Sequence, residues 1–317
     1  MTAPPPAVRC PAKINLALHV LGRRPDGYHE LDTVFQTIDL WDRLEVRPAE
    51  DLSLECNDPA LPTDGSNLVL RAAELLLERR VRRRRGAALR LHKSIPAQGG
   101  LGGGSSDAAG ALRLLAEHWT LDVDDETLAA LGAELGADVP FFLVGGTARG
   151  LARGDRIQPL APLSETPLVL GMPPFGISTA EVFRRLSERL TLPENLVTVR
   201  GPCPHKWLEE KDFGDSGEAG KAGSQRRWAS PEARNDLEPV VFEGWPELKR
   251  FRDALLRAGA LGAMVSGSGS AVYGLFREPA ETAGASVGLQ RQFGRWRVLT
   301  SRTVRGGVRL TPPRQGG

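Results

Sequence analysis

The feature that most constrains the fold is a run of small residues, Gly99–Ser106, which contains only glycine and serine apart from Leu101. Before it, the short alternating stretch Ala87–His92 predicts a strand. After it, apolar residues such as Ala108 and Leu112 recur on one face of a predicted helix. Glycines let a backbone approach a ligand closely, and a helix N-terminus offers unpaired N–H groups at the positive end of its dipole. This order predicts a phosphate-binding loop.

Two common phosphate-binding motifs do not match this loop. A P-loop has lysine and then serine or threonine after its last glycine, but here Gly104 is followed by two serines. The dinucleotide fingerprint requires a strand with a terminal acid after the helix, whereas the next element, Glu126–Leu135, has helical periodicity. A flexible linker is the plain alternative. It is disfavoured because the loop lies between a strand and a strongly amphipathic helix.

Length, charge and cysteine content exclude several protein classes. With 317 residues, the chain predicts about two domains of roughly 150 residues each. Lys and Arg total 41 and Asp and Glu total 39, so the net charge of +2 gives no argument for nucleic acid or membrane binding. The three cysteines, Cys10, Cys56 and Cys203, lack zinc-ligand spacing and predict reduced thiols. No signal peptide or membrane span is evident, so we expect a cytoplasmic protein.

Hydrophobic periodicity predicts mixed strands and helices. The predicted strands include Val8–Val20, Thr33–Ile38, Arg43–Arg47, Leu52–Cys56, a pair within Gly145–Ile157, Pro167–Gly171, Ala263–Val265, Ala271–Phe276 and Arg295–Val304. Further predicted helices are Asn67–Val81, Thr179–Leu190 and Leu248–Ala258. Residues 200–233 are polar and glycine-rich, which predicts a long exposed insertion. We expect one domain over residues 1–160 and a second over residues 161–317.

One segment points to a different class of protein. Six of the seven residues in Arg79–Arg85 are arginine, and such a run can bind nucleic acid electrostatically. However, the run closes a predicted helix, where cations interact favourably with the dipole, and its flanks lack interleaved aromatic residues. A solvated helix end is the favoured interpretation, and an RNA-binding protein is the remote alternative.

Three motifs together resemble the GHMP small-molecule kinases. Pro11–Leu16 resembles their N-terminal motif, Pro96 with Gly99–Ser106 their phosphate loop, and Ser266–Ser270 their C-terminal glycine motif. The resemblance implies an α+β fold of two domains, the N-terminal one a ribosomal-protein-like βαβ domain and the C-terminal one a smaller α/β sandwich. It also implies ATP and Mg²⁺ as cofactors.

Three further motifs narrow the resemblance. Asp26–Leu31, Gly136–Phe142 and Asn235–Glu238 resemble the member that phosphorylates the 2-hydroxyl of an alcohol carrying a cytidine diphosphate group, a step towards isoprenoid precursors outside the mevalonate route. The match runs from Pro11 to about Phe276, and it departs from the family at residues 200–233, which are longer and more polar than expected. The alternative is another kinase of the superfamily, of the homoserine or mevalonate type.

Two residues are predicted to be catalytic. Asp138 follows the end of a predicted helix and precedes Pro140, a place where the chain turns. A carboxylate there can accept a proton from a hydroxyl nucleophile, or it can merely shape an Asx-turn. The resemblance implies the catalytic base. Lys13 lies in an apolar strand, so it must face solvent or meet an anion, and the resemblance implies a place beside Asp138.

The resemblance also implies the binding residues. For ATP they are Pro96, Gly99, Gly100, Leu101, Gly102, Gly103, Gly104, Ser105, Ser106, Asn67 and Lys93, with Ser106 also near a metal ion. For the substrate they are Asn15, Tyr28, His29, Phe183, Gly267 and Gly269. From the residues alone, Asn67 is equally a helix cap, Lys93 an exposed cation, Tyr28 a loop anchor and Phe183 a core residue. We expect a monomer or homodimer without nucleic acid or membrane partners.

Overall fold

The structure, a computed structural model, describes residues 5–81, 85–190 and 233–311 and contains two β-sheets. The larger sheet has the order β11-β1-β2-β4-β3, with β5 paired to β2 and β6 paired to β5. Its strands are β1 (Ala7–Arg23), β2 (His29–Arg47), β3 (Leu52–Cys56), β4 (Ala87–His92), β5 (Thr147–Ala152), β6 (Arg156–Pro159) and β11 (Arg309–Thr311). The smaller sheet, of order β10-β7-β9-β8, contains β7 (Pro167–Met172), β8 (Gly262–Val265), β9 (Val272–Leu275) and β10 (Arg297–Arg302).

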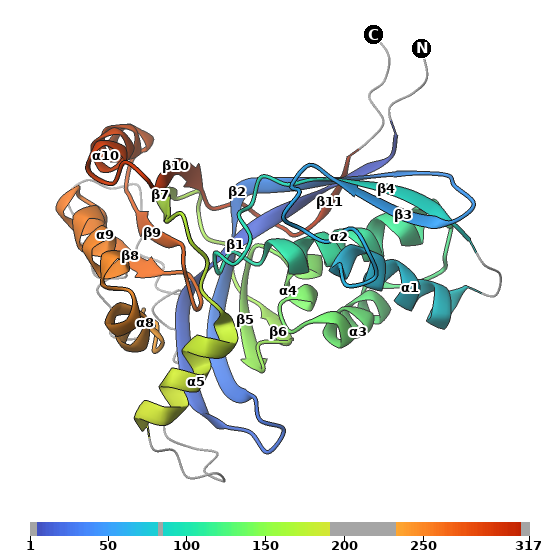
Figure 1. The fold of residues 1–317 in the computed structure, drawn as a ribbon, viewed down its shortest axis with the longest axis horizontal. Coiled ribbons are helices and arrows are strands. Elements are labelled where there is room, and N and C mark those ends of the chain that lie inside the picture. The colour runs from blue at the N-terminus through green and yellow to red at the C-terminus, as the bar shows by residue number, and fades with distance from the viewer. Residues whose placement is uncertain (1–4, 82–84, 191–232, 312–317) are drawn as a thin grey trace.

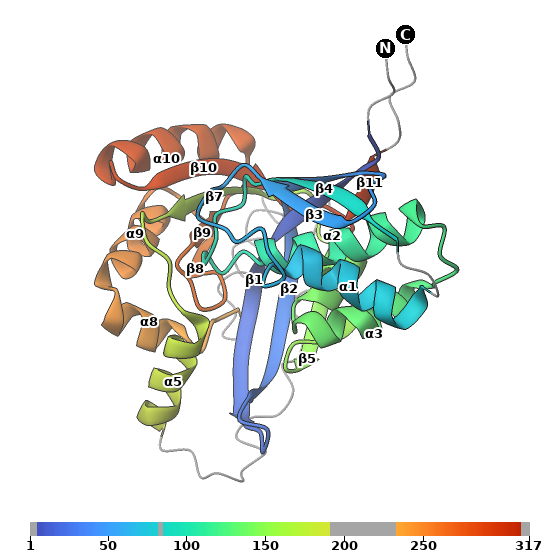
Figure 2. The ribbon, with the colours of Figure 1, turned by 45° about the vertical axis from the view of Figure 1, so that its right-hand side comes forward.

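Helices lie on either side of the long β1–β2 hairpin. In both views α1 to α3 lie on one side of this hairpin and α8 to α10 on the other (Figures 1 and 2). The helices are α1 (Leu68–Arg80), α2 (Gly103–His118), α3 (Asp125–Leu135), α4 (Val139–Val144), α5 (Thr179–Leu190), α8 (Glu238–Gly244), α9 (Pro246–Arg257) and α10 (Pro279–Gln292). No helix of the described residues is long and apolar enough to cross a membrane.

This architecture confirms the predicted α+β class. Strands β3 and β4 are parallel and are joined by α1, which makes a βαβ unit at one edge of the larger sheet. The division at residue 160 stays a prediction. Strand β11 returns from the end of the described chain to pair with β1, so the larger sheet contains strands from both sides of that division. One hydrophobic cluster also joins the two halves, since it contains Ile14 and Ile38 of the hairpin together with Leu168 and Tyr273 of the smaller sheet.

The hairpin is longer and more continuous than predicted. Strand β2 continues through residues 39–42, where Asp39 and Asp42 interrupt the apolar pattern. There Asp42 is fully buried, and the Asp39 carboxylate accepts a hydrogen bond from Trp41 Nε1 at 2.6 Å. A register shift between Pro11 and Ala12 accommodates this stretch in β1. The hairpin therefore contributes side chains to the cores on both of its sides.

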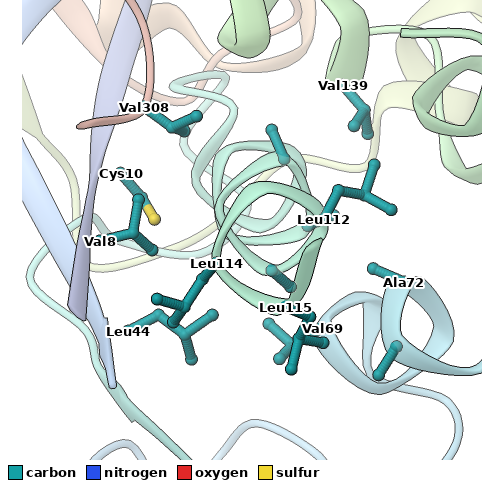
Figure 3. Close-up of a cluster of buried hydrophobic side chains, with 14 of the residues drawn as sticks. Val8, Cys10, Leu44, Val69, Ala72, Leu112, Leu114, Leu115, Val139 and Val308 are labelled. Carbon is teal, nitrogen blue, oxygen red and sulfur yellow. The ribbon is translucent and has the colours of Figure 1, made fainter. Parts of the chain in front are cut away.

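Helix α2 lies at the centre of the larger core. Side chains from β1, β2, α1, α4 and the segment before β11 surround it, as the close-up shows (Figure 3). Gly110 is required there, because a Cβ atom would lie 2.4 Å from Cys10 Sγ. Burial raises the pKa of the Cys10 thiol well above its usual value. Cys10 and Cys56 are free thiols, as predicted, and Cys203 lies outside the described residues.

Four elements were not predicted, namely α4, α8, α10 and β11. Helix α10 has a weak apolar stripe interrupted by Gly284 and Gly288, and its start is marked instead by a capping box between Glu278 and Glu281. Helix α4 has only six residues. The insertion predicted at 200–233 lies almost wholly outside the described residues. The arginine run does close a helix, since α1 ends at Arg80, and Arg79 pairs with Glu134 at 3.1 Å.

Candidate active site

The glycine-rich loop passes directly into α2. The helix begins at Gly103, inside the glycine run, after Gly102 in the left-handed conformation with φ of +70°. A Cβ atom on Gly102 would lie 2.6 Å from Phe142 Cζ, so only glycine fits. No side chain caps this helix start. The first N–H groups of α2 are therefore available to an anion, as the sequence predicts.

The second glycine motif packs against the first. Ser266 Oγ donates a hydrogen bond of 2.9 Å to the carbonyl oxygen of Gly100, and Ala271 N donates one of 3.0 Å to that of Gly99. The approach is so close that a Cβ atom on Gly100, where φ is +72°, would lie 2.0 Å from the Ser266 carbonyl oxygen. Two glycine motifs far apart in the sequence therefore form one wall.

These motifs border a pocket of about 1210 Å³. The predicted residues that line it are Lys13, Asn15, Tyr28, His29, Asn67, Lys93, Pro96, Gly99, Gly100, Gly102, Gly103, Gly104, Ser105, Asp138, Phe183 and Gly267. They come from β1, the turn after it, β2, the start of α1, the segment after β4, the glycine-rich loop, the residue before α4, α5 and the second glycine motif. The fold thus brings together most of the residues that the sequence selected.

Lys13 and Asp138 meet on the wall of this pocket. Lys13 is only 4% exposed, and its Nζ atom lies 3.7 Å from Asp138 Oδ2 and donates a 2.7 Å hydrogen bond to Asn15 Oδ1. Burial lowers the pKa of the Lys13 ammonium, and the charge of Asp138 opposes that shift. Lysine and asparagine share one face of β1 as predicted, and Asn15 Nδ2 donates to Thr33 Oγ1 at 2.8 Å. The lysine faces an anion rather than solvent.

Asp138 is accessible to a ligand. Its side chain is 33% exposed. It occupies the N-cap position of α4, yet its carboxylate makes no capping hydrogen bond there. The Asx-turn alternative therefore finds no support, and the carboxylate lies beside Lys13 instead.

An aromatic group lies at another part of the pocket wall. The His29 and Phe183 rings are 4.8 Å apart and inclined by 32°, and His29 Nε2 lies 2.9 Å from Ser187 Oγ. Burial and the nearby charge of Arg23 lower the pKa of His29, which favours the neutral ring. Tyr28 is 58% exposed. A flat aromatic ligand would find rings to stack on here.

The nucleotide-side predictions for Asn67 and Lys93 meet different outcomes. Asn67 caps α1, because its Oδ1 accepts a 2.9 Å hydrogen bond from Val69 N. Lys93 is not exposed, and that alternative was wrong. Its ammonium forms ion pairs with Asp42 and, at 2.6 Å, with Asp107, inside the wall of the pocket.

Three predicted residues do not line the pocket. Leu101 and Gly269 belong to the packed interior around the two glycine motifs, where Leu101 accepts a 2.9 Å hydrogen bond from Lys13 N through its carbonyl oxygen. Ser106 is fully buried, and its hydroxyl has no hydrogen-bond partner among the described residues. This burial argues against Ser106 as a metal ligand, whereas Ser105 does line the pocket.

Sequence reasoning missed several pocket residues. Asp107, Thr33, Arg153, Thr179 and Ser268 also line it. Asp42 does not, but its Oδ1 atom accepts hydrogen bonds from Ser94 N at 2.5 Å and Ile95 N at 2.9 Å, just before the loop. The only sequence signal for Asp42 was an acidic residue between two predicted strands.

The pocket offers oxygen atoms suited to a magnesium ion. Mg²⁺ is commonly held by one or two protein oxygens together with substrate phosphates. The Ser105 hydroxyl and the Asp138 carboxylate lie on the pocket wall and are of this kind. No cluster of three or more His, Cys, Asp or Glu side chains suited to a metal occurs among the described residues.

Comparison with known proteins defines the class. The model of the GHMP kinases N terminal domain matches residues 67–146, and that of the GHMP kinases C terminal domain matches residues 209–293. The crystal structure of homoserine kinase from Cytophaga hutchinsonii superposes with a TM-score of 0.70 at 17% identity, covering 96% of each chain. The chain therefore has the fold of a GHMP kinase.

Relatives of higher sequence identity show to which family of GHMP kinases the chain belongs. 4-Diphosphocytidyl-2-C-methyl-D-erythritol kinase of Pelotomaculum thermopropionicum is 46% identical over 83% of this chain and 86% of its own length. That of Salinibacter ruber is 41% identical over 90% and 94%. A crystal structure of 4-(cytidine 5′-diphospho)-2C-methyl-D-erythritol kinase matches with a TM-score of 0.72 at 36% identity, covering 95% of this chain and all of that one. The chain belongs to the 4-diphosphocytidyl-2-C-methyl-D-erythritol kinase family of GHMP kinases.

Proposed function

We propose that this protein transfers the γ-phosphoryl group of ATP to the 2-hydroxyl of 4-diphosphocytidyl-2-C-methyl-D-erythritol, in the non-mevalonate route to isoprenoid precursors. The single observation that carries the proposal is the Lys13–Asp138 pair, 3.7 Å apart, in one pocket with a helix-start phosphate loop and an aromatic group. The family membership supports the same chemistry.

Asp138 is the base in this proposal. Its carboxylate accepts the proton of the attacking hydroxyl, while Lys13 orients that carboxylate and stabilises negative charge on the transferring oxygen. The Lys13 ammonium is held in place by Asn15 Oδ1. Catalysis of phosphoryl transfer consists mainly of positioning and charge stabilisation, which a preformed lysine, carboxylate and loop supply.

The phosphates of ATP bind the start of α2. The N–H groups of Gly103, Gly104 and Ser105 receive them, and Asn67 and Lys93 lie on the same side of the pocket. When bound, Mg²⁺ neutralises charge on the phosphates, and the Ser105 hydroxyl on the pocket wall is the group that would hold it.

The cytosine end of the substrate binds at Tyr28, His29 and Phe183. Aromatic rings stack on bases, and the ring nitrogen of His29 that does not face Ser187 can form a hydrogen bond with a base edge. This group favours the cytidine-bearing substrate over homoserine or mevalonate, which carry no base. The near-neutral net charge and the three kinase motifs make the RNA-binding alternative remote, and a salt-dependent gel shift would test it.

The proposal is tested by ADP release from purified protein with ATP, Mg²⁺ and the cytidylyl substrate, with homoserine and mevalonate as controls. We expect turnover with the cytidylyl substrate alone. Turnover with another alcohol instead would mean that the proposed substrate is wrong. A folded, ATP-binding protein with no turnover would overturn the proposal. Sedimentation would distinguish the monomer from the homodimer, and fractionation of cells would test the predicted cytoplasmic location.

A further inference from the structure

One buried amide joins three parts of the protein near the pocket. Asn235 is 3% exposed, and its Nδ2 atom donates hydrogen bonds to the carbonyl oxygens of Val265 at 3.0 Å and Gly267 at 2.7 Å. Its Oδ1 atom accepts one from Leu237 N at 2.9 Å. Both donors of the amide are therefore directed at the end of β8 and at the second glycine motif.

The backbone on either side of Asn235 is bound to β1. Leu18 N donates to the Arg234 carbonyl oxygen and Asp236 N donates to the Leu18 carbonyl oxygen, each at 2.8 Å. Leu18 and Asn235 thus form a short parallel bridge. The amide of Asn235 therefore connects the strand that carries Lys13 and Asn15 to the glycine motif opposite them.

The position of Gly267 bears directly on the reacting groups. Its φ is +58°, and a Cβ atom there would lie 3.3 Å from both Lys13 Nζ and Asn15 Oδ1. Through Ser266 the same motif also holds the carbonyl oxygen of Gly100 in the phosphate loop. A shift of this motif by about 1 Å would misalign groups whose placement can be worth about 10²-fold in rate.

We propose that Asn235 is a positioning residue for phosphoryl transfer, which fixes the Gly267 backbone against Lys13 and Asn15 without touching the substrate. The inference rests on the proposed function, because it assigns those two residues to the reacting centre. It predicts an effect on kcat rather than on the binding of either substrate, since Asn235 does not line the pocket.

The variant Asn235→Asp tests the role of the two donors. An ionised carboxylate would face the carbonyl oxygens of Val265 and Gly267 and repel both, whereas a protonated one can donate to one of them. We expect kcat to fall about 10-fold to 100-fold at pH 8, with the KM of each substrate within about threefold of the unsubstituted value. As the pH is lowered, kcat relative to the unsubstituted protein should rise.

A matched control exists in the same domain. Gln290 Nε2 donates to the Trp296 carbonyl oxygen at 2.8 Å, and its Oε1 accepts from Val298 N at 3.1 Å, far from the pocket. Gln290→Glu makes the same chemical change and should leave kcat unchanged. Lys13, Asp236 and Glu238 also carry charge near the bridge. Glu238 is the closest to Val265, since its Oε1 accepts a 2.9 Å hydrogen bond from Val265 N, and burial raises its pKa to about 7. The rise in relative kcat at low pH must therefore persist when Asn235→Asp is combined with Glu238→Gln.

The outcomes separate the inference from the proposed function. If Asn235→Asp loses no more kcat than Gln290→Glu, or if its loss is the same at every pH, the inference is overturned while the function stands. Absence of turnover in the unsubstituted protein overturns the function and the inference with it. If Asn235→Asp does not fold, Asn235→Ala replaces it. Its melting temperature is then measured, and kcat must fall with unchanged KM for the inference to survive.

Discussion

The two ends of the pocket are built in different ways. The phosphate end consists of backbone: a glycine loop, a helix start and a second glycine motif pressed against it. The base end consists of side chains, with His29 from β2 meeting Phe183 and, 158 positions along the sequence, Ser187 from α5. A site made of backbone depends on glycine at fixed positions. A site made of side chains requires only that the backbone hold the rings together.

The largest expected effect comes from a substitution of Asp138, which lies between the two ends of the pocket. Asp138→Asn removes the proton acceptor while nearly preserving the shape of the side chain, so we expect kcat to fall about 10²–10⁴-fold. Because neither end of the pocket is altered, the KM of ATP and of the cytidylyl substrate should change little. Steady-state ADP release measures both quantities. A variant with more than a tenth of the original kcat would contradict the assignment of Asp138 as the base.

The phosphate end should be sensitive to a single methyl group. Gly100→Ala places a Cβ atom 2.0 Å from the Ser266 carbonyl oxygen at a φ of +72°, which costs about 1–3 kcal/mol of backbone strain in addition to the clash. We expect kcat/KM for ATP to fall at least about tenfold.

Gly288→Ala in α10 is the control for this substitution. Its Cβ atom would meet nothing within 4 Å, so nucleotide kinetics should not change. Equal effects of the two substitutions would mean that the glycine wall does not shape the ATP site.

Substitutions at the base end should change the kinetics of the cytidylyl substrate and not those of ATP. Tyr28→Ala removes a ring that is 58% exposed, and loss of stacking worth about 1–3 kcal/mol would raise the KM of the cytidylyl substrate about 10-fold. Tyr28→Phe keeps the ring and should behave like the original protein. Titration calorimetry with cytidine diphosphate checks the affinity directly. A rise in the KM of ATP instead would show that the two ends are not separate.

The last effect is on stability rather than on kinetics, and it concerns the buried charges beneath the phosphate end. Asp42 accepts bonds from two N–H groups and the Lys93 ammonium, whereas Asp107 bonds Lys93 through one oxygen and its Oδ1 has no partner among the described residues. Burial raises the pKa of Asp107 to about 7, from an ordinary 3.8. The folded chain therefore retains a proton that the unfolded chain releases, and the stability from Asp107 is lost as the pH rises from about 4 through 7.

Asp107→Asn should therefore gain stability relative to the original protein as the pH rises from 5 to 8, by up to about 1.4 kcal/mol per pH unit. Denaturant unfolding at both pH values measures this change. Asp125→Asn, at an exposed ion pair with Arg113, is the control and should show a smaller change. A constant difference for Asp107→Asn would mean that the Asp107 carboxyl does not hold the extra proton.

The contrast between the ends also explains what the sequence could predict. The phosphate loop was predictable because its glycines leave a local signature, and the family resemblance supplied the roles of Asp138, Lys13, Tyr28 and His29. The role of Asp42 was not predictable, since it depends on the pairing of β2 with the end of β4 and on the burial of Lys93. Asn235 belonged to a recognised motif, but its function depends on a contact with Gly267, 32 positions away.

The pairing of β11 with β1 has a consequence for the order of folding. Ala7, Val8 and Arg9 pair with residues 309–311, and Val308 is buried in the core around α2. Domains generally fold as units from the N-terminus during synthesis. Here the first sheet to emerge from the ribosome lacks an edge strand and part of its core until residues 308–311 have been made. Strand β1 therefore waits at this edge for the last of the described strands.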